Sequence, residues 1–338
     1  ALSDDAINNL ASKVCNSIIY ESIQGKSMLA VLPTFHGFGL GMGIHAPLYN
    51  GASSALMIKF NSKKVIKWIN QNKVNLIIGV PLLYQKLMKD ENFVKSKLSN
   101  LQYCFIGGDN VPQSLILSFN SLMENKGSNA KLLEGYGLTE TVTVCNVNTK
   151  KDFKLGSVGK PLNGITIKVF DEQNNELVNE IGEVYITGDT LMNGYLHDLN
   201  TTNSTLVNIK GTTYVKTGDL GYLDHEGFLF LKGRKKRMFK ISGINVYPSE
   251  IEKIATDIED VIDASLEFYQ EPTPHLNLFA IKHRDSTKSK DEISRIIYEQ
   301  LNKKVLKYSI PKEIIFIDKF PQTKVGKIDH EQLKKLGK

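Results

Sequence analysis

Side chains capable of chemistry cluster in the segment Glu134–Thr141, whose sequence is EGYGLTET. Two glycines flank Tyr136 directly after an apolar run typical of a buried strand, and glycines let the backbone approach a ligand closely. The ring of Tyr136 could stack on a nucleotide base. Thr139 could donate a hydrogen bond to a phosphate oxygen, and Glu140 could hold Mg²⁺, which favours oxygen ligands. We interpret the segment as a nucleotide loop, with a strand-to-helix turn capped by Thr139 as the alternative.

Two more segments each carry one notable charged residue. In Tyr214–Asp224, Asp219 stands between glycines, where a carboxylate could accept hydrogen bonds from both hydroxyls of a ribose. An aspartate in an ordinary β-turn is the alternative. In the segment that begins at Phe320, Lys327 follows a glycine and could place a positive charge on a phosphate or on developing negative charge. The alternative is a surface lysine, which is the usual environment of this residue type.

A cationic run begins the segment Gly233–Glu252, whose sequence is GRKKRMFKISGINVYPSEIE. Nucleic-acid binding, a domain hinge beside a phosphate ligand, and a solvated basic loop are all compatible with it. The run lacks interleaved aromatic residues that would stack on bases.

The elements that must position these residues alternate between short apolar runs and amphipathic stretches up to Leu133. The apolar runs predict strands at Met28–Leu32, Ala55–Ile58, Leu76–Val80, Tyr103–Ile106 and Lys131–Leu133. Helical spacing predicts helices at Lys63–Asn72, Pro81–Lys89 and Val111–Glu124. Strand–helix alternation is typical of a mostly parallel α/β sheet. We assign it to residues 1–150.

The pattern changes after Lys150. Frequent glycines between short apolar runs predict a turn-rich β subdomain over residues 151–232. Beyond the cationic run, the pattern predicts a small α+β domain. Its expected helices are Pro248–Asp257 and Asp291–Val305, and its expected strands are Ala264–Phe268, Leu278–Lys282 and Glu313–Ile317. We therefore expect an α/β protein with a large domain over 1–232, a hinge over 233–236 and a small domain over 237–338.

Composition limits the class of protein. The chain has 338 residues, of which 41% are hydrophobic and 23% charged, as in ordinary globular proteins. The net charge is +6, and residues 233–338 contribute +5 of it with 21 Lys or Arg against 16 Asp or Glu. The three cysteines have neither metal-ligand spacing nor a disulfide pattern, which favours a reducing compartment and a cytoplasmic location. No apolar run approaches the ~20 residues that span a bilayer.

The order of these motifs along the chain resembles that of the acyl-adenylate-forming superfamily of acyl-CoA synthetases, luciferases and adenylation domains. EGYGLTET is followed by KTGDLGYLD, by GRKKRMFKISGINVYPSEIE and by PQTKVGKIDH. Upstream, PTFHGFG at Pro33–Gly39 is similar to the family's acyl-site motif, and FIGGDNVP at Phe105–Pro112 to its glycine-rich strand end.

The resemblance implies an AMP-forming acid–CoA ligase that uses ATP, Mg²⁺, a small carboxylic acid and coenzyme A. It implies that Thr139 contacts phosphate, that Glu140 coordinates Mg²⁺ and that Lys327 is the catalytic lysine of adenylation. His36 resembles the gate between the acyl pocket and the thiol tunnel. The implied nucleotide-binding residues are Gly107, Gly108, Asp109, Gly135, Tyr136, Gly137, Asp219 and Arg234. Lys236 matches the hinge, and Ser242 and Gly243 match the loop of the thioester step.

Two departures refine these expectations. Amino-acid-activating relatives place an aspartate near Phe35–Gly37, and this chain has none there, which favours a simple carboxylic acid as the substrate.

The family's phosphate loop ending in Pro-Lys-Gly is absent, and it should lie just upstream of Ala1. We therefore expect a truncated large domain, little ligase activity from these 338 residues alone, and exposed apolar surface near the N-terminal strands. The alternative to coenzyme A as acceptor is the thiol of a carrier protein. The alternative to an enzyme is an inactive fragment that binds a nucleotide or nucleic acid. We expect no nucleic-acid partner and no membrane span.

Overall fold

The computed structural model describes residues 1–241, 244–270, 273–322 and 328–337. The chain divides into two compact units, Ala1–Leu231 and Lys232–Lys338. The division falls one residue before the expected end of the large domain, and each unit is described by itself. Within the described residues, no helix is long and apolar enough to cross a membrane.

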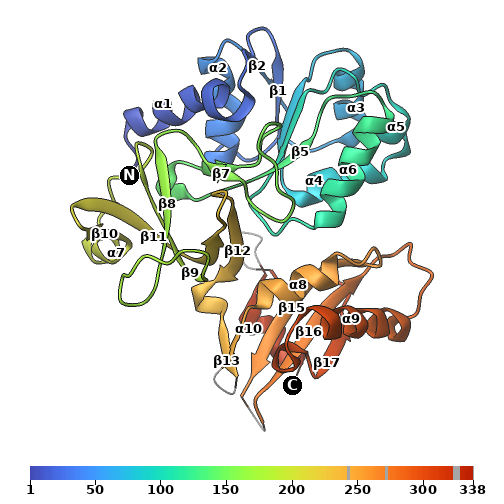
Figure 1. The fold of residues 1–338 in the computed structure, drawn as a ribbon. Helices are drawn as coiled ribbons and strands as arrows, with labels where there is room; N and C mark the ends of the chain where they lie inside the picture. The colour runs from blue at the N-terminus through green and yellow to red at the C-terminus, as the bar shows by residue number, and fades with distance from the viewer. Residues whose placement is uncertain (242–243, 271–272, 323–327, 338) are drawn as a thin grey trace. The chain divides into compact units, whose positions relative to one another are not determined.

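A seven-stranded sheet forms the centre of the first unit, with strand order β2-β1-β3-β4-β5-β6-β7 (Figure 1). The first five of these strands in space pair in parallel, and β6 and β7 continue the sheet antiparallel. The strands are β1 Ser27–Ala30, β2 Ser53–Leu56, β3 Leu76–Gly79, β4 Tyr103–Ile106, β5 Leu132–Gly137, β6 Val144–Val147 and β7 Lys160–Pro161. The expected mostly parallel α/β sheet is confirmed, and β7 extends it beyond residue 150, the limit expected from sequence.

Alternate side chains of the parallel strands enter two separate cores, as the two-residue period of a strand requires. In β3, for example, Ile77 faces one core while Leu76 and Ile78 face the other. The helices on the Ile77 side are α3 Ser62–Asn70, α4 Pro81–Lys89, α5 Glu91–Lys95 and α6 Gln113–Asn125. The helices on the other side are α1 Asp4–Lys13, the π-helices η1 Val14–Ile19 and η2 Phe38–His45, and α2 Ala46–Tyr49.

The remainder of the first unit is antiparallel. Strands β8 Ile165–Phe170, β9 Gly182–Gly188, β10 Leu206–Ile209 and β11 Thr212–Leu223 form a sheet of order β10-β11-β9-β8, to which β12 Leu229–Arg234 adds through β11. A short helix, α7 Leu199–Thr205, precedes β10. Ile165, Ile167 and Ile186 of this sheet pack into the same core as α1 and η1. The turn-rich β subdomain is therefore observed.

The second unit is a small α+β fold. It contains a hairpin, β13 Phe239–Ile241 with β14 Ile244–Val246, and a three-stranded sheet β15-β16-β17. The three strands are β15 Val261–Tyr269, β16 His275–Lys282 and β17 Glu313–Phe316. The helices are α8 Pro248–Thr256, α9 Lys290–Lys304 and α10 His330–Leu336. Helices α8 and α9 share one core with the sheet, and α10 contributes Leu333 to a second one.

Two expectations about local structure were incomplete. Glu134–Gly137 are not a loop after a strand, because β5 continues through Gly137. The cationic run is not a simple loop either, since β12 extends to Arg234 and β13 begins at Phe239.

Apolar surface lies near the N-terminal strands, as expected. β2 is an edge strand of the seven-stranded sheet, Leu56 is 61% exposed and Ile58 just beyond it is fully exposed. Phe35, after β1, is 92% exposed.

Candidate active site

A pocket of about 60 Å³ lies at the carboxyl ends of the parallel strands, where open α/β sheets bind ligands. Three segments predicted from sequence meet there: the loop after β1 with His36, the end of β4 with Gly107 and Gly108, and the end of β5 with Tyr136. Apolar side chains make up much of the remaining lining: Ile18, Phe38, Met42, Ile78, Phe105, Ile106, Val144 and Val147. His36 is fixed locally, because its Nδ1 accepts a hydrogen bond from the Phe38 amide at 3.1 Å.

Asp219 is joined to this pocket through Tyr136. The Tyr136 hydroxyl donates a hydrogen bond to Asp219 Oδ2 at 2.5 Å. The pKa of Tyr136 is raised well above its usual value, mainly by burial and secondly by the nearby Asp219 carboxylate. The hydroxyl therefore remains a donor. Asp219 is buried in β11 rather than in a simple turn, at an irregularity in the pairing of β11 with β9. Its amide donates to Thr217 Oγ1 at 3.0 Å, which holds the irregular backbone in place.

Thr139 and Glu140 lie on a single 3₁₀ turn, η3 Thr139–Thr141, directly after β5. Thr139 is exposed, whereas Glu140 is half-buried. The Tyr195 hydroxyl donates to Glu140 Oε1 at 2.5 Å, and the Met192 amide donates to the Glu140 carbonyl at 2.8 Å. The segment after β9 therefore holds both the side chain and the backbone of Glu140.

A strained turn follows η3. Val142 has φ 66° and ψ −59°, and the Thr143 amide donates to the Thr141 carbonyl at 2.8 Å, which defines a γ-turn centred on a β-branched residue. Residues in such conformations cluster at functional sites, where the surrounding structure enforces them.

Close backbone contacts enforce the γ-turn from two sides. A Cβ added to Gly37 would lie 2.1 Å from the Val142 carbonyl oxygen, and a Cβ added to Gly137 would lie 1.6 Å from the Thr143 carbonyl oxygen. Only glycine fits at either position. The loop containing His36 and the turn after Glu140 are thus packed directly on each other.

The oxygen donors suit Mg²⁺, although the described residues contain no cluster of three metal-binding side chains. Mg²⁺ is usually held by one or two carboxylates together with substrate phosphates and water. Glu140 offers such a carboxylate beside the exposed hydroxyl of Thr139. The residues present therefore fit a Mg²⁺ ion that arrives with a nucleotide.

The other predicted site residues are distributed as follows. Asp109 follows the pocket glycines but is exposed and does not line the pocket; its carboxylate accepts from the Asn110 amide. Arg234 and Lys236 belong to the second unit. Lys327, Ser242 and Gly243 lie outside the described residues.

Sequence reasoning missed two functional features of the site, the Tyr195 contact and the Val142 turn. A single sequence predicts neither feature. Tyr195 is 55 residues from Glu140, so no local motif links them. A valine gives no indication that its backbone has a positive φ.

The profile described as "AMP-binding enzyme" matches residues 4–196, more than half of the chain. The chain belongs to the AMP-binding enzyme family. It is 30% identical over 308 residues to the 2-succinylbenzoate–CoA ligase of Lactococcus lactis, covering 90% of this chain and 61% of that protein. It is 28% identical over 331 residues to the long-chain-fatty-acid–CoA ligase of Bacillus subtilis, covering 95% of this chain and 56% of that protein.

The fold agrees with the family. The o-succinylbenzoate CoA synthetase of Bacillus subtilis, solved with its acyl-adenylate intermediate, superposes with a TM-score of 0.82 at 24% identity, over 98% of this chain and 65% of that one. This AMP-binding family member therefore spans about three-fifths of the length of the relatives it matches.

Proposed function

We propose that this chain carries most of the active site of an AMP-forming acid–CoA ligase. The supporting observation is the convergence of His36, the β4 glycines and the β5 segment around one pocket, with Tyr136 tied to Asp219. In the proposed reaction a carboxylate oxygen attacks the α-phosphorus of ATP and pyrophosphate leaves. The sulfur of coenzyme A then attacks the acyl carbon of the adenylate, and AMP leaves.

The nucleotide part of the proposal rests on donors and acceptors with fixed positions. Asp219 would accept hydrogen bonds from the ribose hydroxyls, and its bond from Tyr136 orients it for that task. The adenine would lie in the slot between the β4 glycines and the ring of Tyr136. Thr139 would donate to a phosphate oxygen. Mg²⁺ held by Glu140 would neutralise charge on the phosphates.

The acid would occupy the apolar end of the pocket. Its lining contains no Asp or Glu side chain to pair with an α-amine. A simple carboxylic acid therefore suits the pocket better than an amino acid, in agreement with the interpretation of Phe35–Gly37. His36, at the pocket edge, would separate the acid from the incoming thiol.

The second unit would supply the remaining charges. We propose that Lys327 faces the reacting carboxylate and α-phosphate during adenylation, with Arg234 near the ribose. Lys236 would act as the hinge that brings Ser242 and Gly243 to the thioester step. The motifs around these residues support these roles.

The test has two arms. A polypeptide that contains this chain is assayed for pyrophosphate exchange with a panel of carboxylic and amino acids, and then for thioester formation with free coenzyme A or a pantetheinylated carrier protein. We expect exchange with simple acids and transfer to coenzyme A. Exchange only with amino acids, or transfer only to the carrier protein, would contradict the proposed substrate or acceptor. For the 338-residue chain alone, calorimetry with AMP tests the nucleotide site without requiring turnover.

A further inference from the structure

A strongly basic surface lies away from the pocket, on the helices that cover the opposite face of the parallel sheet. Residues 59–97 contain nine lysines, no arginine and only two acids, a net charge of +7. The other residues of Ala1–Leu231 contain eleven lysines and eighteen acids, a net charge of −7. The first unit thus has one strongly positive segment although its net charge as a whole is zero.

All nine lysines are exposed: six lie on helices that bury their apolar sides against the sheet, and three lie in the loops beside these helices. The nine are Lys59, Lys63, Lys64, Lys67, Lys73, Lys86, Lys89, Lys95 and Lys97. Val65, Ile66 and Ile69 of α3 and Phe93 of α5 all belong to the core on that side. We refer to the outer faces of α3, α4 and α5 and the loops beside them, with these nine lysines, as the basic helix layer.

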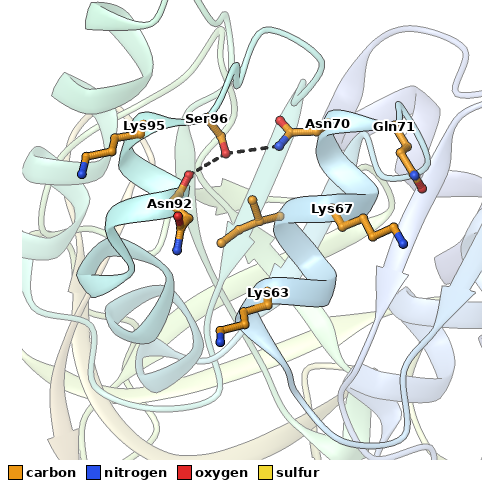
Figure 2. A pocket seen from close by; sticks show the side chains of 8 residues that line it. Lys63, Lys67, Asn70, Gln71, Asn92, Lys95 and Ser96 are labelled. Atoms are coloured by element: carbon orange, nitrogen blue, oxygen red, sulfur yellow. Dashed lines mark hydrogen bonds between the residues drawn. The ribbon is translucent and has the colours of Figure 1, made fainter.

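An open groove of about 730 Å³ crosses the basic helix layer between α3 and α5 (Figure 2). Lys63, Lys67 and Asn70 follow one line of α3, at i, i+4 and i+7, and Lys95 comes from α5. Asn70 and Ser96 join the two helices through a hydrogen bond of 3.4 Å. The lysines of the groove therefore come from two helices that share one core and lie side by side.

The two acids of this segment are already occupied locally. Glu91 pairs with Lys95 at 2.6 Å, and Asp90 accepts from Ser62 Oγ at 2.7 Å and from the Asn92 amide at 3.0 Å. Among the described residues, neither Lys63 nor Lys67 has a carboxylate within ion-pair distance. The charges of Lys63 and Lys67 therefore face solvent and are available to an external anion.

We propose that the basic helix layer binds the surface of a membrane rich in anionic lipids. Clustered lysines are attracted to the negative potential of such a surface, each contributing roughly a fivefold gain in binding. Leu82, 54% exposed, shares one face of α4 with Lys86 and Lys89 and could enter the headgroup region beside them. This inference is independent of the proposed ligase activity.

Other polyanions fit the surface less well. Protein interfaces are depleted in lysine. Specific phosphate sites favour the planar fork of arginine, which is absent from this segment. Single-stranded nucleic acid is usually held by exposed aromatic faces that stack on its bases, and the ring of Trp68 is covered by Lys64 Nζ at 4.6 Å from its centre.

The test is co-sedimentation of the chain with vesicles of phosphatidylcholine alone or with about 30% phosphatidylglycerol, at about 50 mM and about 500 mM salt. The test variant is K63Q/K67Q/K95Q. The matched control is K303Q/K304Q/K307Q, which removes the same charge from exposed lysines of the second unit. We expect binding only to the anionic vesicles and at low salt, reduced at least tenfold in the test variant and less than twofold in the control. Circular dichroism checks that both variants are folded.

Equal binding to the neutral vesicles, or equal losses in the two triple variants, would overturn the proposal. So would a preference for polyuridylate or polyglutamate over the anionic vesicles, since the ligand would then be a nucleic acid or an acidic protein.

Discussion

The hydroxyl of Tyr195 donates a 2.5 Å hydrogen bond to Oε1 of Glu140, linking the segment after β9 to the turn after β5. The pKa of Tyr195 is raised, mainly by burial and secondly by the hydrogen bond to Glu140. The hydroxyl therefore stays protonated, and remains a donor, up to and through the ordinary tyrosine range. Glu140 is thus held in one orientation before any ligand binds.

Tyr195→Phe removes this bond and leaves the ring. Mutating a residue that hydrogen-bonds a metal-binding side chain typically weakens metal affinity by about 10–100-fold. We therefore expect the Mg²⁺ concentration for half-maximal nucleotide binding to rise by about tenfold. Magnesium titration of ATP binding measures this shift. Tyr49→Phe, which alters an exposed tyrosine of α2, is the control. An unchanged titration would show that Tyr195 does not position Glu140 for the metal.

Asp219→Ala should weaken AMP binding. Loss of a charged hydrogen-bond acceptor costs about 1.5–3 kcal/mol, which corresponds to roughly 10–150-fold in affinity. Calorimetry with AMP gives the value, and Glu172→Ala, at an exposed turn, should leave it unchanged. If Asp219→Ala alters affinity for the acid but not for AMP, the ribose assignment is wrong.

Gly37→Ala should disrupt the γ-turn at Val142. The new methyl group would meet the Val142 carbonyl oxygen at 2.1 Å, and overpacking of this kind costs about 1–3 kcal/mol. We expect lower stability in urea and weaker AMP binding. Gly41→Ala is a closely matched control, because its Cβ would meet the nearest atom, Thr143 Cγ2, at an ordinary 3.5 Å. Similar effects of the two substitutions would argue against the turn as the cause.

Lys327→Ala should abolish pyrophosphate exchange in a polypeptide that contains this chain. The lysine would no longer offer charge to the carboxylate and α-phosphate. Thioester formation from supplied acyl-adenylate should largely survive, since the second unit would then use the segment of Ser242 and Gly243. Equal loss of the two half-reactions would contradict this division of roles.

Asp260→Asn should make the second unit less stable at pH 7, and this loss should shrink as the pH falls below the ordinary aspartate range. Hydrogen bonds from Lys288 at 2.6 Å and Ser286 at 2.7 Å lower the pKa of Asp260. A carboxyl with a lowered folded pKa stabilises the fold above its unfolded pKa, and this contribution disappears as the pH falls through the folded value. Because Lys288 is nearly half exposed, we expect a loss of only about 1 kcal/mol at pH 7.

Hydrogen exchange of β15 and α9 in urea measures the Asp260 effect within the second unit. Asp318→Asn, at an exposed carboxylate, is the control. A loss that is as large in acid as at pH 7 would indicate a packing defect instead of a lost charge interaction.

The local pattern of apolar, polar and proline residues in the sequence determined much of the secondary structure of this protein. The spans Tyr103–Ile106 and Pro81–Lys89 are a strand and a helix with the predicted bounds, because a short apolar run and a proline at a helix start act over a few residues. The order of EGYGLTET and the later motifs likewise indicated the family and brought attention to Tyr136, Glu140 and Asp219.

Tertiary structure alone decided how these residues are held. The bond from Tyr136 to Asp219 spans 83 residues, and that from Tyr195 to Glu140 spans 55. The strained conformation of Val142 exists because the backbone near Gly37 and Gly137 packs against it. Such contacts depend on sheet order and on the meeting of distant loops, whereas the periodicity of a sequence reports only which side of a helix or strand is buried.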